Sequence, residues 1–204
     1  MSRLLVFLHL LMKQRALQAE LSEALSALTI TAVGRVADFD RALQQGQDAV
    51  LTLTPVLESH GFTPRLRGYR HGRSDEPYAL VSVDRMPARE SIRGVGALDL
   101  LGREGTVEFV HELVDAEPNV ERVSKLEDLL PLLQLKRVEA ILLPARLVPE
   151  LQRTSEMRLV ARELEHRVGL VALAVLTPAG NQPLSAVTKL KPDILQQLGI
   201  DAWR

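Results

Sequence analysis

Hydrophobic and polar positions along the first third of the chain change between strand-like and helical spacing. Leucines recur at helical spacing, with charged residues on the opposite face, at Leu17, Leu21, Leu25 and Leu28. Asp38 is suited to cap the second helix, and Gly46 and Pro55 are suited to end elements. The expected elements are strands over 3–9, 28–33 and 48–55 and helices over 13–28 and 38–45. This order predicts a largely parallel sheet with right-handed crossovers.

The remaining sequence repeats this pattern after a polar stretch at 62–98, which we interpret as strands plus a crossover. Gly102 to Gly105 predicts a turn, and Ser124 with Glu127 fits a capping box before an apolar run. Pro131 lies inside that helix, so a kink or a shorter helix is expected. The expected strands are 77–84, 92–101, 138–144, 158–164 and 168–176; the expected helices are 106–114, 124–135, a short turn at 147–152, and 184–198 with a break at Pro192.

Two interpretations fit the apolar run from Leu4 to Met12. It is either a buried strand, which we favour, or the apolar region of a signal peptide with a cleavage point near Ala19. Lys13 and Arg15 lie where a signal peptide is usually small and neutral. An export signal upstream or within 1–19 would make the protein periplasmic, and otherwise it is cytoplasmic. No run of about 20 apolar residues exists, so stable membrane insertion is not expected.

Composition excludes several classes of function. The 204 residues are 46% hydrophobic with a net charge of −1, which is typical of a folded domain without an overall attraction to nucleic acid. Zero cysteine excludes disulfides, thiolate metal sites and a cysteine nucleophile. With one Trp, two Tyr and four Phe, binding by aromatic stacking is disfavoured. We therefore expect no nucleic-acid partner.

Motifs for catalysis, cofactors or metals are weak. The glycines of Gly94-Val-Gly96 begin like a dinucleotide fingerprint, but Asp99 stands where the third glycine is required. P-loop, H-E-x-x-H and G-x-S-x-G motifs are missing from the sequence, and no histidine pair has metal-ligand spacing. Adjacent carboxylates such as Glu127 and Asp128 are better explained by helix solvation than by acid–base catalysis. We expect no enzyme activity, no cofactor and no metal.

The two halves of the chain contain similar segments: RALQQGQDAVLTLTP in the first and LLQLKRVEAILLP in the second. Together with GRVADFDRALQQGQDAVLTLTPVLESHG and VGALDLLGREGTVEFVHELV, this order resembles the type II periplasmic binding proteins, nearest to the phosphate- and phosphonate-type receptors of ABC transporters. The resemblance covers about residues 3 to 204. It implies a two-lobed α/β fold with mostly parallel sheets flanked by helices. Lobe 1 would be 1–90 plus 168–204 and lobe 2 would be 91–167, with crossovers near 85–95 and 163–170.

The resemblance implies a small ligand, such as phosphate, phosphonate or a carboxylate, bound in a cleft between the lobes, and an ABC permease as partner. Ligands of such sheets bind beyond the carboxyl ends of the strands, where helix N-termini and arginines suit an anion. The expected ligand-binding residues are His9, Gly34, Arg35, Thr54, Pro55, Gly102, Arg103, Pro144 and Arg146. The alternative for each arginine is a surface salt bridge, for Thr54 a β-forming role, and for His9 simple packing.

The densest charge run is basic, at Arg65, Arg67, Arg70, His71 and Arg73. It is interpreted as a solvated hairpin loop that Asp75 and Glu76 partly neutralise, with contact to phosphates or a partner protein as the alternative. The function expected overall is solute capture for ABC-type transport. The alternatives are a sensor or interaction domain of the same fold and, third, a small-substrate enzyme.

Overall fold

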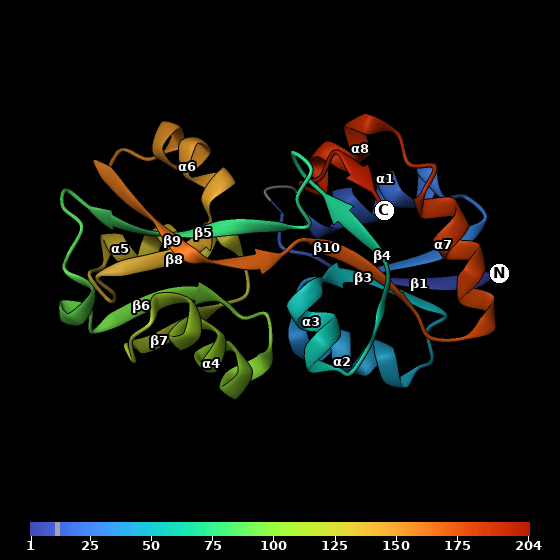
Figure 1. Cartoon of the computed structure of the whole chain (residues 1–204), viewed down its shortest axis with the longest axis horizontal. Coiled ribbons are helices and arrows are strands. Elements are labelled where there is room, and N and C mark those ends of the chain that lie inside the picture. Colours follow the sequence, from blue (N-terminus) through green and yellow to red (C-terminus); the bar gives the residue numbers. More distant parts are fainter. Residues whose placement is uncertain (11–12) are drawn as a thin grey trace. The chain divides into compact units, whose positions relative to one another are not determined.

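The computed structural model describes residues 1–10 and 13–204, which form two compact units. Unit 1 comprises Met1–Asp75 and Gly169–Arg204, and unit 2 comprises Glu76–Val168 (Figure 1). The first boundary comes earlier than the 85–95 expected from the sequence, and the second comes at Gly169. The earlier boundary has a physical cause, because the strand after Asp75 pairs inside the sheet of unit 2.

Unit 1 is built on a six-stranded sheet with the order β11-β4-β10-β3-β1-β2. Strand β1 is parallel to β2 and β3, whereas β10 is antiparallel to β3 and β4, and β11 is antiparallel to β4. The elements are β1 (Ser2–Phe7), α1 (Gln14–Ala24), β2 (Leu28–Val33), α2 (Val36–Gln44), β3 (Ala49–Leu53), α3 (Thr54–Ser59), β4 (Pro64–Tyr69), β10 (Val171–Val175), η4 (Pro178–Gly180), α7 (Asn181–Val187), α8 (Pro192–Gln197) and β11 (Ala202–Trp203).

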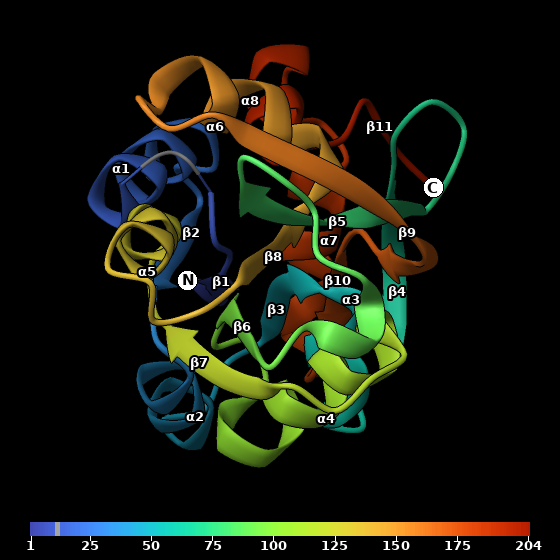
Figure 2. The same cartoon turned by 90° about the vertical axis from the view of Figure 1, so that its left-hand side faces the viewer.

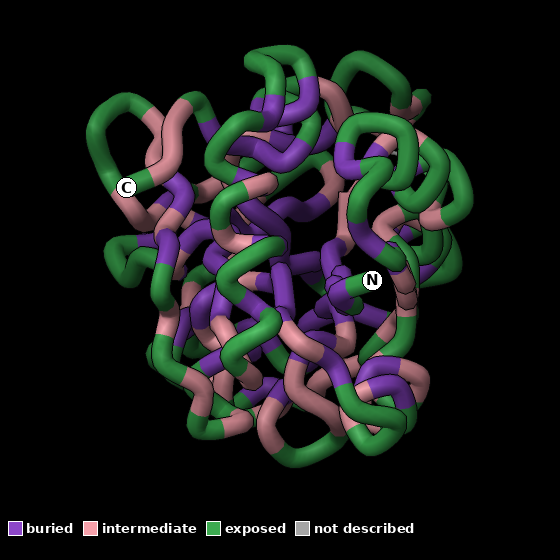
Figure 3. Tube along the Cα trace, turned by 90° about the vertical axis from the view of Figure 1, so that its right-hand side faces the viewer, coloured by how far each residue is buried: buried purple, intermediate pink, exposed green. Residues whose placement is uncertain are grey.

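The apolar run at the N-terminus is a strand, as favoured from the sequence. β1 lies between β2 and β3, and its residues from Leu4 to Phe7 are buried (Figure 3). The last two positions of that run, residues 11 and 12, lie outside the described residues. Cleavage near Ala19 would remove a central strand, so a signal peptide ending there is incompatible with this fold.

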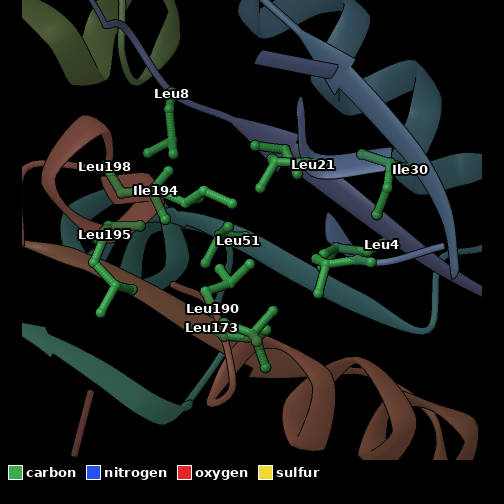
Figure 4. Close-up of a cluster of buried hydrophobic side chains, with 14 of the residues drawn as sticks. Leu4, Leu8, Leu21, Ile30, Leu51, Leu173, Leu190, Ile194, Leu195 and Leu198 are labelled. Atoms are coloured by element: carbon green, nitrogen blue, oxygen red, sulfur yellow. The ribbon is translucent and has the colours of Figure 1, made fainter. Parts of the chain in front are cut away.

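The core of unit 1 lies between one face of the sheet and helices α1, α7 and α8. Strand leucines Leu4, Leu51 and Leu173 meet Leu21 of α1 and Ile194 of α8 in one buried cluster (Figure 4). The spacing of Leu17, Leu21 and Leu25 that predicted the helix is therefore the buried face of α1. On the other face of the sheet, Phe7 stacks on Phe39 of α2 with ring centroids 5.0 Å apart.

Asp48 joins three segments of unit 1 just before β3. Its carboxylate accepts hydrogen bonds from the backbone N–H of Arg3 at 2.8 Å and from the hydroxyl of Thr177 at 2.6 Å. The hydroxyl bond and, next, the N–H bond hold the pKa of Asp48 below its ordinary value, because both donors stabilise the ionised form. Gly180 approaches the carbonyl oxygen of Asp48 so closely that a Cβ would clash with the backbone.

Unit 2 is built on a five-stranded sheet with the order β7-β6-β8-β5-β9 (Figure 2). Strand β6 is parallel to β7 and β8, and β5 is antiparallel to β8. The elements are β5 (Asp75–Val83), η1 (Arg89–Ser91), β6 (Gly94–Leu98), α4 (Gly102–Val114), β7 (Asn119–Val123), η2 (Leu126–Asp128), α5 (Leu129–Gln134), β8 (Ala140–Pro144), η3 (Ala145–Leu147), α6 (Val148–Thr154) and β9 (Leu159–Gly169).

The glycines that resembled a dinucleotide fingerprint have packing roles in β6. A Cβ on Gly96 would lie 2.7 Å from Leu132 of α5 and 3.1 Å from Ile141 of β8, so glycine allows the helix to approach the sheet. The backbone N–H of Gly94 donates to Glu139 at 2.6 Å. On the α4 side, Val95 and Val110 belong to one buried cluster.

Several local expectations are wrong in detail. Helix α2 begins at Val36, so Asp38 lies in its first turn, bonded to Arg41 at 3.1 Å, and is not the N-cap. The residues Ser124 and Glu127 form no capping box, because η2 begins at Leu126 without a side-chain cap bond. Gly102–Gly105, expected as a turn, is the first turn of helix α4. Strand β7 was not expected from the sequence. Both sheets were expected to be largely parallel, but each contains parallel and antiparallel pairs.

The two similar sequence segments fold alike. In unit 1 the segment is helix α2 followed by β3, which is parallel to the first strand of its unit. In unit 2 it is helix α5 followed by β8, which is parallel to β6. Pro131 lies in the first turn of the short helix α5, where backbone N–H groups form no hydrogen bond within the helix, so proline is tolerated there. The expected shorter helix is confirmed.

Candidate functional site

Parallel pairing in unit 1 brings the predicted residues of that unit to one edge of the sheet. Phe7 of β1 is in register with Val33 of β2 and with Thr52 of β3. The residues that follow these three positions therefore emerge at the same carboxyl edge. They are His9 after β1, Gly34 and Arg35 after β2, and Thr54 and Pro55 after β3.

The side chains at this edge differ in how far the fold engages them. Arg35 is exposed and is the N-cap residue of α2, and its side chain makes no cap hydrogen bond. His9 is half-buried, and its ring lies edge-on to Phe7 with centroids 5.0 Å apart. Gly34 has room for a methyl group, since a Cβ there would lie 3.5 Å from Oε1 of Gln14. Among the predicted residues at this edge, Arg35 is therefore the exposed charged group.

Thr54 has a structural bond that the sequence did not show. Its hydroxyl donates to the carbonyl oxygen of Leu170 at 2.8 Å, and its backbone N–H donates to the same oxygen at 3.0 Å. The residue is 6% exposed, and Gly169 provides the space that its side chain needs. Because the hydroxyl proton is engaged in the fold, Thr54 is left with acceptor capacity only.

In unit 2 the predicted residues also follow parallel strands. Gly102 and Arg103 come after β6. Pro144 is the last residue of β8, which is parallel to β6, and Arg146 follows it. Gly102 has a φ of 76°, which favours glycine at the start of α4. The N-cap residue of α4 is Leu101, whose side chain makes no cap hydrogen bond, and Arg103 is exposed in the first turn.

The most buried charged group among the predicted residues is Arg146. Its Nε lies 2.9 Å from Oε2 and 3.2 Å from Oε1 of Glu76, and the side chains are 16% and 8% exposed. Strands β5 and β8 are antiparallel, with Tyr78 opposite Pro144, so the start of β5 lies beside the carboxyl end of β8. Within the described part of the chain, only Nε of Arg146 is hydrogen-bonded, so Nη1 and Nη2 keep donors for a ligand.

Tyr78 lies next to this ion pair and is buried. Desolvation, and secondly the negative charge of Glu76, raise the pKa of the phenol well above its ordinary value. Its ring packs edge-on to Phe109 of α4 with centroids 6.0 Å apart. Arg146 thus lies beside a buried phenol and a buried carboxylate, and the carboxylate of Glu76 offsets part of the guanidinium's positive charge.

A second polar network fixes the loop between β6 and α4. Asp99 accepts from the hydroxyl of Thr106 at 3.0 Å and from Nη1 of Arg122 at 2.7 Å. The same hydroxyl oxygen of Thr106 accepts the backbone N–H of Leu101 at 3.0 Å. These contacts hold the segment that leads into α4, and with it Gly102, in one conformation.

Four residues near these strand ends were not expected from the sequence: Glu76, Tyr78, Thr106 and Arg122. Glu76 and Tyr78 reach the edge only because β5 runs antiparallel to β8, and the sequence carries no signal for that pairing. Asp99 directly follows β6, which ends at Leu98, whereas the strand expected from the sequence ran on to residue 101 and included Asp99.

Among residues 1–10 and 13–204, no group of three or more His, Cys, Asp or Glu could hold a metal ion. Ser59, His60 and Asp40 do lie in contact, with Ser59 Oγ 3.1 Å from Nδ1 and Asp40 Oδ1 3.1 Å from Nε2. However, the carbonyl of Val56 lies 2.9 Å from Nδ1 and requires an N–H there, so this nitrogen cannot take a proton from Ser59.

No helix in the described residues is long and apolar enough to cross a membrane. No protein-family model matches the sequence, and no curated protein sequence matches it.

Solved structures do share its architecture. The substrate-binding protein of an amino acid ABC transporter has a TM-score of 0.63 and 13% identity, covering 97% of this chain and 93% of that one. Arginine-bound ArgBP from T. maritima, as a variant, has a TM-score of 0.61 and 16% identity, covering 97% and 96%. The BvgS periplasmic VFT2 domain of Bordetella pertussis has a TM-score of 0.62 and 13% identity, covering 96% and 91%. At such identities the likeness establishes the fold, and it does not extend to phosphate specificity. The chain therefore has the two-unit α/β fold of the type II periplasmic binding proteins.

Proposed function

We propose that this protein captures a small anionic solute, a carboxylate or an oxyanion such as phosphate or phosphonate, at the carboxyl edges of its sheets. The observation that carries the proposal is Arg146. Its guanidinium is held by buried Glu76 through Nε, while both terminal nitrogens retain their donors. The planar pair of terminal nitrogens suits bidentate recognition of a carboxylate or phosphate.

The similar structures support solute capture, because they include the substrate-binding protein of an amino acid ABC transporter and arginine-bound ArgBP. They also support a binding protein over an enzyme. Transport with an ABC permease, after export to the periplasm, is the role that we propose first. The second role that we propose is that the same fold senses a solute without passing it to a transporter. A permease gene beside this gene would favour transport, whereas a neighbouring kinase or regulator gene would favour sensing.

A thermal-shift screen tests the ligand class directly. The panel contains phosphate, methylphosphonate, acetate, succinate, glutamate and arginine, with neutral glycerol as a control. A ligand at about 100 times its Kd stabilises the folded state by roughly 2.7 kcal/mol. We expect at least one anion to raise Tm and glycerol to leave it unchanged. A panel in which no anion raises Tm would overturn the anionic proposal.

Variants then identify the residues that bind. Arg146→Lys keeps the positive charge beside Glu76 but loses the planar fork, so we expect at least tenfold weaker binding of the anion found in the screen. Arg153→Lys is the matched control, because Arg153 is an exposed arginine of unit 2 that pairs with Glu150. Arg35→Gln and Arg103→Gln test the exposed arginines of units 1 and 2. Unchanged affinity in Arg146→Lys, with a normal circular dichroism spectrum, would remove Arg146 from the site.

A further inference from the structure

The hydroxyl of Tyr78 is an unused hydrogen-bond donor beside the ion pair of unit 2. The residue is only 5% exposed, yet its hydroxyl makes no hydrogen bond within the described part of the chain. Its oxygen does not belong to the described polar atoms that are both fully buried and unpartnered, so the hydroxyl reaches solvent. A buried tyrosine usually directs its hydroxyl to a partner. Here the partner has to come from solvent, as water or as a solute.

Strand pairing places the side chain of Tyr78 on the same face as that of Arg146. Tyr78 is opposite Pro144 in the antiparallel pair of β5 and β8, and the same register continued by two residues sets Glu76 opposite Arg146. The contact of 2.9 Å between Glu76 and Arg146 shows that these two side chains meet. Glu76 and Tyr78 are alternate residues of one strand, so their side chains point to one face. Tyr78 and Arg146 are therefore diagonal neighbours, a separation that an aromatic ring and a long side chain can span.

The charges of the ion pair act on this phenol. Desolvation is the main cause of the raised pKa of Tyr78, the carboxylate of Glu76 raises it further, and the guanidinium of Arg146 opposes both. The phenol therefore lies within electrostatic reach of both charges, and it stays protonated and able to donate at neutral pH. Packing fixes the ring, since Phe109 of α4 meets it edge-on with centroids 6.0 Å apart. A donor that is already held in place loses little conformational freedom when a ligand binds.

Two kinds of donor are thus available to a ligand beside the end of β8. The terminal nitrogens Nη1 and Nη2 of Arg146 form a planar fork that suits two oxygens of an anion. We propose that the hydroxyl of Tyr78 donates to a third oxygen of the same anion and makes the site selective for anions that carry one. The inference rests on the proposed function, because it requires an anion at Arg146.

The ligand class that follows is a small anion with an acceptor oxygen beyond the two that the fork takes. A phosphoryl or phosphonyl group has such an oxygen on phosphorus, and a hydroxycarboxylate has it on the neighbouring carbon. A simple monocarboxylate such as acetate has none. An anion of this last kind displaces water from the hydroxyl and gives it no acceptor in return, so the site discriminates against it.

Titrations of the full chain with three small anions test this proposal. Acetate offers two oxygens, glycolate adds a hydroxyl oxygen, and methylphosphonate has three oxygens on phosphorus. Each Kd is measured by isothermal titration calorimetry. We expect glycolate or methylphosphonate to bind at least about fivefold more tightly than acetate, because one further hydrogen bond contributes about this factor or more. The tighter of the two identifies the source of the third oxygen.

The variant Tyr78→Phe removes the hydroxyl and keeps the ring that packs on Phe109. We expect the preference over acetate to fall to about twofold or less, whereas the affinity for acetate itself should not change. The hydroxyl has no bond to other described residues, so without ligand this variant should keep the Tm of the unmodified chain. Tyr69→Phe is the matched control, because it removes a tyrosine hydroxyl from unit 1 and should keep the preference.

Four results would overturn the proposal. They are equal affinity for the three anions in the unmodified chain, a preference that survives in Tyr78→Phe, loss of the preference in Tyr69→Phe as well, and binding of another anion of the thermal-shift panel but of none of these three. A lowered ligand-free Tm of Tyr78→Phe, with all three anions bound equally more weakly, would assign the hydroxyl to the fold instead. If Arg146→Lys still weakens the binding of an anion in these cases, the proposed function stands and only the role of Tyr78 fails. A chain that binds no anion at all would overturn both.

Discussion

The ion pair between Glu76 and Arg146 allows a quantitative test of unit 2. Both side chains are largely removed from water, at 8% and 16% exposed. Removing one partner of a buried pair costs about 3–5 kcal/mol, mainly because an unpaired charge is left behind. Arg146 keeps some access to solvent, so Glu76→Gln should cost about 3 kcal/mol, at the lower end of this range. Arg146→Met removes the guanidinium from the more buried carboxylate and should cost a similar amount.

The double variant Glu76→Gln/Arg146→Met separates the ion pair from its surroundings. Neither single penalty applies when both charges are removed, so the double variant should cost about 2 kcal/mol less than the two singles together. The matched control is Glu150→Gln with Arg153→Met, an exposed pair with side chains 41% and 72% exposed. For that pair we expect a coupling of about 0.5 kcal/mol or less.

Urea denaturation measures these values. Trp203 is the single tryptophan and belongs to unit 1, so its fluorescence follows that unit, while far-UV circular dichroism follows both. If the two units unfold separately, substitutions in unit 2 should shift the circular dichroism transition and leave the fluorescence transition in place. A coupling for Glu76 and Arg146 that is no larger than for the control pair would refute the assignment of a buried, energetically important ion pair.

Three further predictions concern individual side chains. The hydrogen bond from Thr177 is the main cause of the lowered pKa of Asp48, so the ionised carboxylate stabilises the fold above about pH 4, and this stabilisation is lost as the pH falls further. Asp48→Asn should therefore lower Tm at pH 7, and the difference in Tm should shrink as the pH falls toward 2. Because the pKa of Tyr78 is raised in the folded state, the stability of the fold should fall as the pH rises above about 10. In a Tyr69→Phe variant, whose remaining tyrosine is Tyr78, tyrosinate absorbance should appear only as the circular dichroism signal is lost. Tyrosinate absorbance before unfolding would contradict the burial of Tyr78. Gly180→Ala should cost about 1–3 kcal/mol in urea denaturation, because its Cβ would meet backbone at Asp48; an unchanged midpoint would show that the backbone there can move.

Local sequence patterns predicted the elements of this protein well where one face of the element is buried. The leucines of α1 repeat with the helical period, and in β2 burial alternates over Leu28, Thr29 and Ile30 as expected for a strand. Predictions that depended on a single polar residue were poorer. Asp38 and Ser124 had the chemistry of helix caps, but the helices begin where backbone packing places them, at Val36 and Leu126.

The candidate site shows the same division. Because parallel strands share an edge, the sequence alone placed Arg35, Arg103 and Arg146 beyond strand ends. The state of each side chain was decided by residues distant in sequence. Arg146 is held by Glu76, 70 positions away, and the Thr54 hydroxyl is bonded to Leu170, 116 positions away.

The sequence by itself determined many of the strands and helices, the similar halves and the fold that they resemble, because periodicity and punctuation act over a few residues. Only the tertiary structure decided which strands are antiparallel, where the chain passes between units, and which charges are neutralised. Asp75 and Glu76 are adjacent in sequence, yet one pairs with Arg73 in unit 1 and the other with Arg146 in unit 2. Coulombic and hydrogen-bond energies depend on distance in space, and strand pairing sets those distances without regard to separation along the chain.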